Sequence, residues 1–171
     1  SRGCPFSCSY CESTTIKDTY KSAGIKGFCR HKSPEKFVRD CELLVKKYGV
    51  EFFYIAQGTF LTMPDKVLEE LAGLFRKRVN KPFLCLTTVP SITTKRIGLL
   101  KKMGCWQVNI GIEAGNEIYR KEVLHRPNMS NELIIKAFRA VKDAGIRVSA
   151  YSMIGLPWHS RKDVFDTIKL N

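Results

Sequence analysis

The sequence has 171 residues and 44% hydrophobic content, which is enough for one domain with a sizeable core. Its apolar runs are far too short to span a bilayer, and its first residues are polar and cysteine-rich, unlike a signal peptide. The seven cysteines are odd in number and partly clustered, which predicts metal binding in a reducing, cytoplasmic compartment rather than a disulfide framework.

The formal net charge of +13 suggests an anionic partner, such as nucleic acid, a phosphorylated substrate or a small carboxylate. The basic residues are spread along the chain, with one cluster at 76–78 and Lys81. That cluster lies at a predicted helix end, where cations are favoured by the helix dipole. Solvated helix faces therefore explain the charge more simply than a nucleic-acid interface, which stays open as an alternative.

Three cysteines lie near the start of the chain at C-x3-C-x2-C spacing: Cys4, Cys8 and Cys11. Tyr10 stands just before the last of them. Three thiolates can hold one soft metal centre, but structural zinc takes four ligands and an ordinary iron–sulfur cluster takes four cysteines. The loop therefore predicts a [4Fe–4S] cluster with one iron open to another ligand. Half of a zinc knuckle, buried small hydrophobes, or a fourth ligand from Cys29 are the alternatives.

Residues 12–32 show no clean period and are predicted to form a loop. After them, amphipathic helices alternate with short apolar strands. The predicted helices begin near Ser33, Pro64, Thr94, Ser130 and Ser160, and the predicted strands cover 50–56, 83–88, 106–112 and 146–154. This alternation predicts an α/β fold, with a parallel sheet and helices outside it.

The cysteine loop, Tyr10 included, resembles the signature of the radical S-adenosylmethionine (radical SAM) enzymes. Four further segments carry the resemblance along the chain: Ser33-Pro34-Glu35, Ile112-Glu113-Ala114-Gly115-Asn116, Met129-Ser130-Asn131-Glu132 and Ile154-Gly155-Leu156-Pro157. They are most similar to radical SAM proteins that carry a cobalamin-binding domain before the barrel. The resemblance implies that 1–171 is a fragment of a radical SAM core domain. That domain is a (β/α)6 TIM-like barrel, here truncated at both ends, with its chemistry at the carboxyl ends of the strands.

The resemblance also assigns roles to residues of the cysteine loop and of the first predicted strand end. Cys4, Cys8 and Cys11 would ligate the cluster, and Tyr10 would line the adenine side of SAM. Gln57 follows the first predicted strand, where relatives usually carry two acidic residues that bind the amino group of SAM. Its neutral amide can accept an N–H without charge assistance, and a simple polar turn explains it equally well.

Three later residues complete the predicted SAM site. Glu113 follows the strand 106–112, and its carboxylate can accept hydrogen bonds from both ribose hydroxyls. Arg126 has the chemistry for a bidentate grip on the SAM carboxylate, although a surface arginine explains it as well. Ile154 would pack against adenine.

In the family that the chain resembles, an electron from the cluster cleaves SAM to methionine and a 5′-deoxyadenosyl radical. We therefore expect a radical SAM enzyme that acts on an unidentified small-molecule or anionic substrate. The most similar subgroup implies methylation or rearrangement, with cobalamin held by a domain outside this chain. A flavodoxin or ferredoxin is the expected kind of reductant, and no membrane partner is expected.

Two alternatives to this function remain. A tRNA or protein methylthiotransferase has a similar cysteine loop but needs three further cysteines in an upstream domain. A non-catalytic, zinc-dependent nucleic-acid-binding module explains the charge and the cysteines, but it does not explain the residues at the strand ends.

Overall fold

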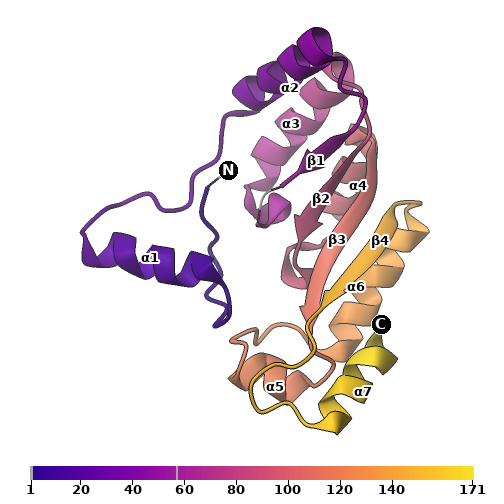
Figure 1. Ribbon diagram of the computed structural model, residues 1–171. Helices are drawn as coiled ribbons and strands as arrows, with labels where there is room; N and C mark the ends of the chain where they lie inside the picture. Colours follow the sequence, from indigo (N-terminus) through magenta and orange to yellow (C-terminus); the bar gives the residue numbers. More distant parts are fainter. Residues whose placement is uncertain (1, 57) are drawn as a thin grey trace.

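A computed structural model describes residues 2–56 and 58–171. Its centre is a four-stranded parallel sheet in the order β1 (Phe53–Ile55), β2 (Phe83–Thr87), β3 (Cys105–Glu113) and β4 (Arg147–Ser152). Each strand pairs with the next strand in the sequence, and helices fill the crossovers between them (Figure 1). Parallel neighbours need such crossovers. The predicted α/β fold, with a parallel sheet and outer helices, is confirmed.

The predicted helices are present: α2 (Pro34–Tyr48), α3 (Asp65–Arg78), α4 (Thr94–Met103), α6 (Asn131–Asp143) and α7 (Arg161–Leu170). Short 3-10 turns, η1 (Phe60–Thr62) and η2 (Val89–Ser91), follow β1 and β2. Ser33 caps α2 by accepting a hydrogen bond from the backbone N–H of Lys36, and Gly49 ends this helix with a φ of 65°. Glycine adopts this left-handed conformation without steric cost.

Two helices lie where the sequence predicts none. α1 (Glu12–Ser22) occupies half of the expected loop over 12–32, and α5 (Glu117–Glu122) follows β3. The prediction of a loop over 12–22 is therefore wrong. α1 has no buried residue, so no apolar stripe marks it in the sequence, and α5 is too short for a period to show. Figure 1 shows α1 standing away from the sheet on an arm of its own.

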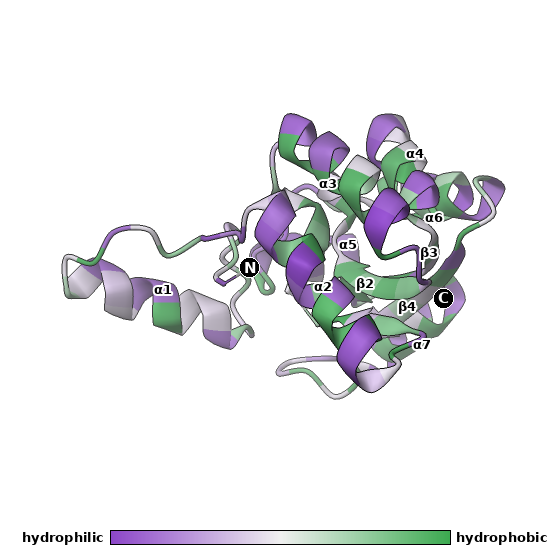
Figure 2. Ribbon diagram, turned by 90° about the horizontal axis from the view of Figure 1, so that it is seen from above, coloured by the Kyte–Doolittle hydropathy of each residue, from purple (hydrophilic) through white to green (hydrophobic). Residues whose placement is uncertain are grey.

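The hydrophobic core lies between one face of the sheet and the helices. Phe75 of α3 contacts the rings of Phe53 and Phe83, with ring centroids 6.3 and 5.4 Å apart. Figure 2 shows apolar strands beneath helices whose outer surfaces are hydrophilic. On β2, side chains alternate between full burial in this core and half-burial on the opposite face of the sheet. That opposite face is free to line a site. Within the described ranges, we find no helix with the length and apolar character needed to cross a membrane.

Candidate functional site

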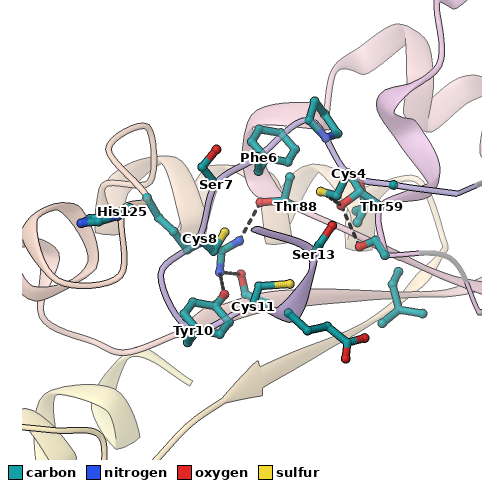
Figure 3. Close-up of a pocket in the computed structure, with 18 of the residues that line it drawn as sticks. Cys4, Phe6, Ser7, Cys8, Tyr10, Cys11, Ser13, Thr59, Thr88 and His125 are labelled. Atoms are coloured by element: carbon teal, nitrogen blue, oxygen red, sulfur yellow. Dashed lines mark hydrogen bonds between the residues drawn. The ribbon is translucent and has the colours of Figure 1, made fainter. Parts of the chain in front are cut away.

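A cavity of about 800 Å³ lies between the cysteine loop and the carboxyl ends of the strands. Its walls include Thr59 after β1, Thr88 after β2, and Gly111 and Glu113 at the end of β3. Parallel strands bring their carboxyl ends to one edge of a sheet, so these side chains meet although they are far apart in sequence. Figure 3 shows the cavity with the cysteine loop across it.

Cys4, Cys8 and Cys11 all line this cavity as half-buried, free thiols. In Figure 3, Cys8 and Cys11 lie beside Tyr10, whereas Cys4 lies beside Thr59. The Cys4 sulfur is 4.0 Å from the Thr59 hydroxyl oxygen. The structure therefore brings the three predicted ligands to one site at the sheet edge.

Hydrogen bonds hold the cysteine loop to the segment that follows α5 and to the first turn of α1. The Ser9 N–H donates to the Leu124 carbonyl oxygen at 3.3 Å, and the Ser9 hydroxyl donates to the Val123 carbonyl oxygen. Thr14 in the first turn of α1 donates from its hydroxyl to the Cys8 carbonyl oxygen at 2.8 Å. The loop is thereby held on two sides.

A single zinc ion and an iron–sulfur cluster would require different spacings of the three sulfurs. Within 2–56 and 58–171, no three His, Cys, Asp or Glu side chains converge as the ligands of one metal ion would. With Zn–S bonds of about 2.3 Å, zinc would draw its thiolates to within about 4 Å of one another. The three cysteines of a [4Fe–4S] cluster bind different irons and therefore surround a larger body.

Arg126 connects three parts of the site through its guanidinium group. Nη1 donates to Oε1 of Glu113 at 3.0 Å, to the Gly111 carbonyl oxygen at 2.9 Å and to the Tyr10 hydroxyl at 3.2 Å. Nη2 donates to the Thr88 hydroxyl at 2.7 Å. The Arg126 and Glu113 side chains are only 7% and 14% exposed. One buried ion pair thus joins the cysteine loop to the ends of β2 and β3.

The electrostatics of this pair depend on burial. Burial raises the pKa of Glu113, and this is opposed by the charge of Arg126 and by a hydrogen bond with Tyr10. Burial also raises the pKa of Tyr10, so its hydroxyl stays protonated and able to donate. Arg126 and Tyr10 together favour the ionised form of Glu113, which is an acceptor at the cavity wall.

The backbone at Glu113 is strained. Its φ is 67°, a left-handed value that costs a residue with a side chain roughly 1–2 kcal/mol. The pairing with β4 shifts register between Gly111 and Glu113, and such irregularities re-aim side chains. A Cβ on Gly111 would lie 2.1 Å from Oε1 of Glu113. The absence of a side chain at Gly111 therefore leaves the space that the Glu113 carboxylate occupies.

Arg120 is a supporting residue that the sequence did not predict. It is fully buried, and its guanidinium donates to the carbonyl oxygens of Ala114 and Met129 and to the side-chain oxygen of Asn131. Its own carbonyl accepts the N–H of Arg126 at 2.8 Å. Arg120 thus braces the turn after Glu113 and the segment that carries Arg126. No periodic signal marks it, because α5 is so short.

Two predicted site residues are not joined to this constellation. Ile154 is 64% exposed and is not among the described residues that line the cavity. Its contact with adenine stays a prediction. Gln57 lies outside the described residues, whereas its neighbours Gly58 and Thr59 line the cavity.

The model of the Radical SAM superfamily matches residues 1–170, so the chain belongs to that superfamily. It is 27% identical over 171 residues to an anaerobic magnesium-protoporphyrin IX monomethyl ester cyclase of Rubrivivax gelatinosus, a match that covers 99% of this chain and 29% of the relative. The family implies a [4Fe–4S] cluster and SAM, and the free cysteine thiols around the cavity are suitable ligands for the cluster.

Solved structures of cobalamin-dependent members share the fold. The radical enzyme OxsB with aqua-cobalamin and S-adenosylmethionine bound matches with a TM-score of 0.77 at 16% identity, covering 99% of this chain and 25% of OxsB. The methyltransferase TsrM from Kitasatospora setae, with cobalamin and a [4Fe–4S] cluster bound, matches with a TM-score of 0.73 at 15% identity, covering 98% of this chain and 32% of TsrM. The four parallel strands and outer helices match part of a radical SAM barrel. The chain spans less than a third of each of these relatives.

Proposed function

We propose that residues 1–171 form part of the core domain of a radical SAM enzyme, with Cys4, Cys8 and Cys11 as the cluster ligands. The observation that supports this most directly is that one cavity is lined both by these thiols and by the buried Glu113–Arg126 pair. When bound, the cluster supplies the electron for reductive cleavage of SAM. The residues of this chain bind SAM and orient it.

Within this site, Glu113 accepts hydrogen bonds from the hydroxyls of SAM. Arg126 and Tyr10 hold the Glu113 carboxylate in place. The bidentate grip of Arg126 on the SAM carboxylate stays a prediction, because its Nη1 and Nη2 already donate to protein acceptors. Tyr10 beside adenine stays a prediction as well.

The reaction on the substrate is also part of the proposal. The names of the relatives, a cyclase and cobalamin-dependent enzymes, support cobalamin-dependent methylation or rearrangement, with cobalamin held outside this chain. Free thiols at the site favour a reducing cytoplasm, where a flavodoxin or ferredoxin supplies electrons. A methylthiotransferase remains an alternative, and it requires a second cluster on three cysteines outside this chain.

Metal analysis of anaerobically purified protein tests the cluster. We expect a brown protein with about four irons and a matching amount of sulfide per chain. Calorimetric titration should then show SAM binding to the loaded protein. A colourless protein that holds zinc and no sulfide would contradict the proposal and support the zinc-dependent nucleic-acid-binding module.

Gly111→Ala should weaken SAM binding without removing the cluster. The new methyl group would meet Oε1 of Glu113 at 2.1 Å and force the carboxylate away from Arg126. Since a charge-assisted hydrogen bond is worth about 1.5–3 kcal/mol, we expect at least about a tenfold loss of SAM affinity by calorimetry. The matched control is Gly98→Ala in α4, where the added methyl group meets nothing within 4 Å. Equal SAM affinity in both variants would show that the Glu113 position does not matter.

A further inference from the structure

Arg2 and Arg30 face each other across an antiparallel bridge at the rim of the cavity. The Arg2 N–H donates to the Arg30 carbonyl oxygen at 2.7 Å, and the Arg30 N–H donates to the Arg2 carbonyl oxygen at 2.8 Å. Residues that are directly opposite in such a pair project their side chains from the same face. Both residues line the cavity. The side chains of Arg2 and Arg30 therefore leave the backbone on the same face of the bridge and both reach the cavity.

This pair of like charges is not neutralised within the described chain. Among residues 2–56 and 58–171, neither guanidinium forms an ion pair with a carboxylate. Arg30 instead lies against Tyr20, with Nη2 3.5 Å from the hydroxyl and the guanidinium carbon 6.0 Å from the ring centroid. Directly opposed like charges repel each other and are destabilising. An anion bound between the two guanidinium groups would be attracted to both and would offset that repulsion.

The bridge is built on close backbone packing. Gly3 has a φ of 78°, and a Cβ there would lie 2.3 Å from the Phe28 carbonyl oxygen, so the two segments meet only because position 3 is glycine. The Tyr20 and Phe28 rings pack edge to face with centroids 5.4 Å apart, which joins α1 to the segment that carries Arg30. The backbones that carry the two arginines therefore have a fixed separation.

We propose that Arg2 and Arg30 bind a phosphate-type oxyanion, a phosphate or phosphonate group of the substrate, at the rim of the cavity. Guanidinium groups present forked N–H donors that match such oxygens. Arg2 lies two residues before Cys4 and Arg30 lies between α1 and α2, whereas Glu113 ends β3 and Arg126 follows α5. The assignment of this anion to the substrate rests on the proposed function, but the binding of the anion does not.

Titration with inorganic phosphate tests the site, both in the protein after cluster loading and in the protein as purified, at low ionic strength, where charge interactions are least screened. Arg2→Gln and Arg30→Gln should each weaken phosphate binding by about tenfold, the loss expected for a charge-assisted hydrogen bond. Arg30→Lys keeps the charge without the fork and should show a smaller loss. The matched control is Arg139→Gln, which removes the same charge from the exposed surface of α6 and should bind like the wild type. Unchanged binding in the Arg2 and Arg30 variants, or equal weakening in the control, would overturn the proposal.

A second titration separates this site from the SAM site. Phosphate should bind equally well with and without saturating SAM, and competition between them would mean that the arginine pair belongs to SAM. Circular dichroism and iron content identify any variant that fails to fold, and Arg30→Lys, the milder change, then carries the test. If the wild-type chain binds phosphate but neither cluster nor SAM, the proposed function fails while the anion site stands.

Discussion

Replacing Cys8 with alanine is expected to abolish cluster binding, with iron falling from about four atoms per chain to near zero. Cys8 is the middle one of the three proposed ligands, and it lines the cavity with Cys4 and Cys11. Two remaining thiols leave a second iron without a protein ligand. Release of 5′-deoxyadenosine from SAM should be lost with the iron. Iron and sulfide assays, with chromatography of the SAM products, measure both effects.

Cys29→Ala is the matched control, because it removes an exposed thiol that does not line the cavity. It should keep the iron and the release of 5′-deoxyadenosine. Loss of iron in this variant would instead identify Cys29 as a fourth ligand. Unchanged 5′-deoxyadenosine release in Cys8→Ala would rule out the proposed cluster ligation.

Arg126→Met should lower SAM affinity by more than about tenfold at neutral pH and destabilise the fold by about 3–5 kcal/mol, the usual effect of removing one partner of a buried ion pair. Burial already raises the pKa of Glu113, and the charge of Arg126 opposes that rise. Loss of the Arg126 charge should therefore raise the Glu113 pKa further. Calorimetric SAM titration and denaturant unfolding measure the two effects.

The pH dependence of the variant follows from the sign of this shift. A carboxyl whose pKa is higher in the folded state than in the unfolded state stabilises the fold while it is protonated. The free energy of unfolding of Arg126→Met should therefore fall as pH rises through the Glu113 pKa, and more steeply than in the wild type. SAM affinity should move the other way and partly recover at high pH, because the carboxylate is the acceptor.

A double variant separates stability from binding. Adding Glu113→Gln to Arg126→Met removes the uncompensated carboxylate, so stability should return toward the wild-type value while SAM affinity stays low. Arg139→Met, on the exposed surface of α6, controls for the loss of one positive charge. Wild-type SAM affinity in Arg126→Met would show that this ion pair has no part in binding.

The sheet and the helices that pack on it were predictable because burial leaves a period in the sequence. Phe75 and Phe83 belong to such patterns, and their rings meet in the core. α1 was not predictable, since a helix without buried residues carries no apolar stripe. Its acidic first turn and basic last turn, Glu12 and Lys21, are consistent with a helix but are too common to identify one.

The sequence predicted only those site residues whose side-chain chemistry and position in a local motif both indicate a role. The cysteine spacing, and the place of Glu113 directly after a strand, are local features of the sequence. The contact between Tyr10 and Arg126 joins residues 116 positions apart, and it depends on how the arm docks on the segment after α5. Arg120 depends equally on tertiary packing, because its acceptors come from separate segments.

At Glu113 the ion pair of the side chain outweighs the strain of a left-handed backbone. Glycine would relax the main chain there at no steric cost, and it would remove the carboxylate in the same step. The same change would leave the Arg126 guanidinium buried without its partner, which costs about 3–5 kcal/mol and outweighs the roughly 1–2 kcal/mol of backbone strain, so the stability of the fold favours glutamate here as much as the proposed cofactor binding does. A thermostable descendant of this protein needs its added stability from elsewhere, for example from the exposed arm around α1.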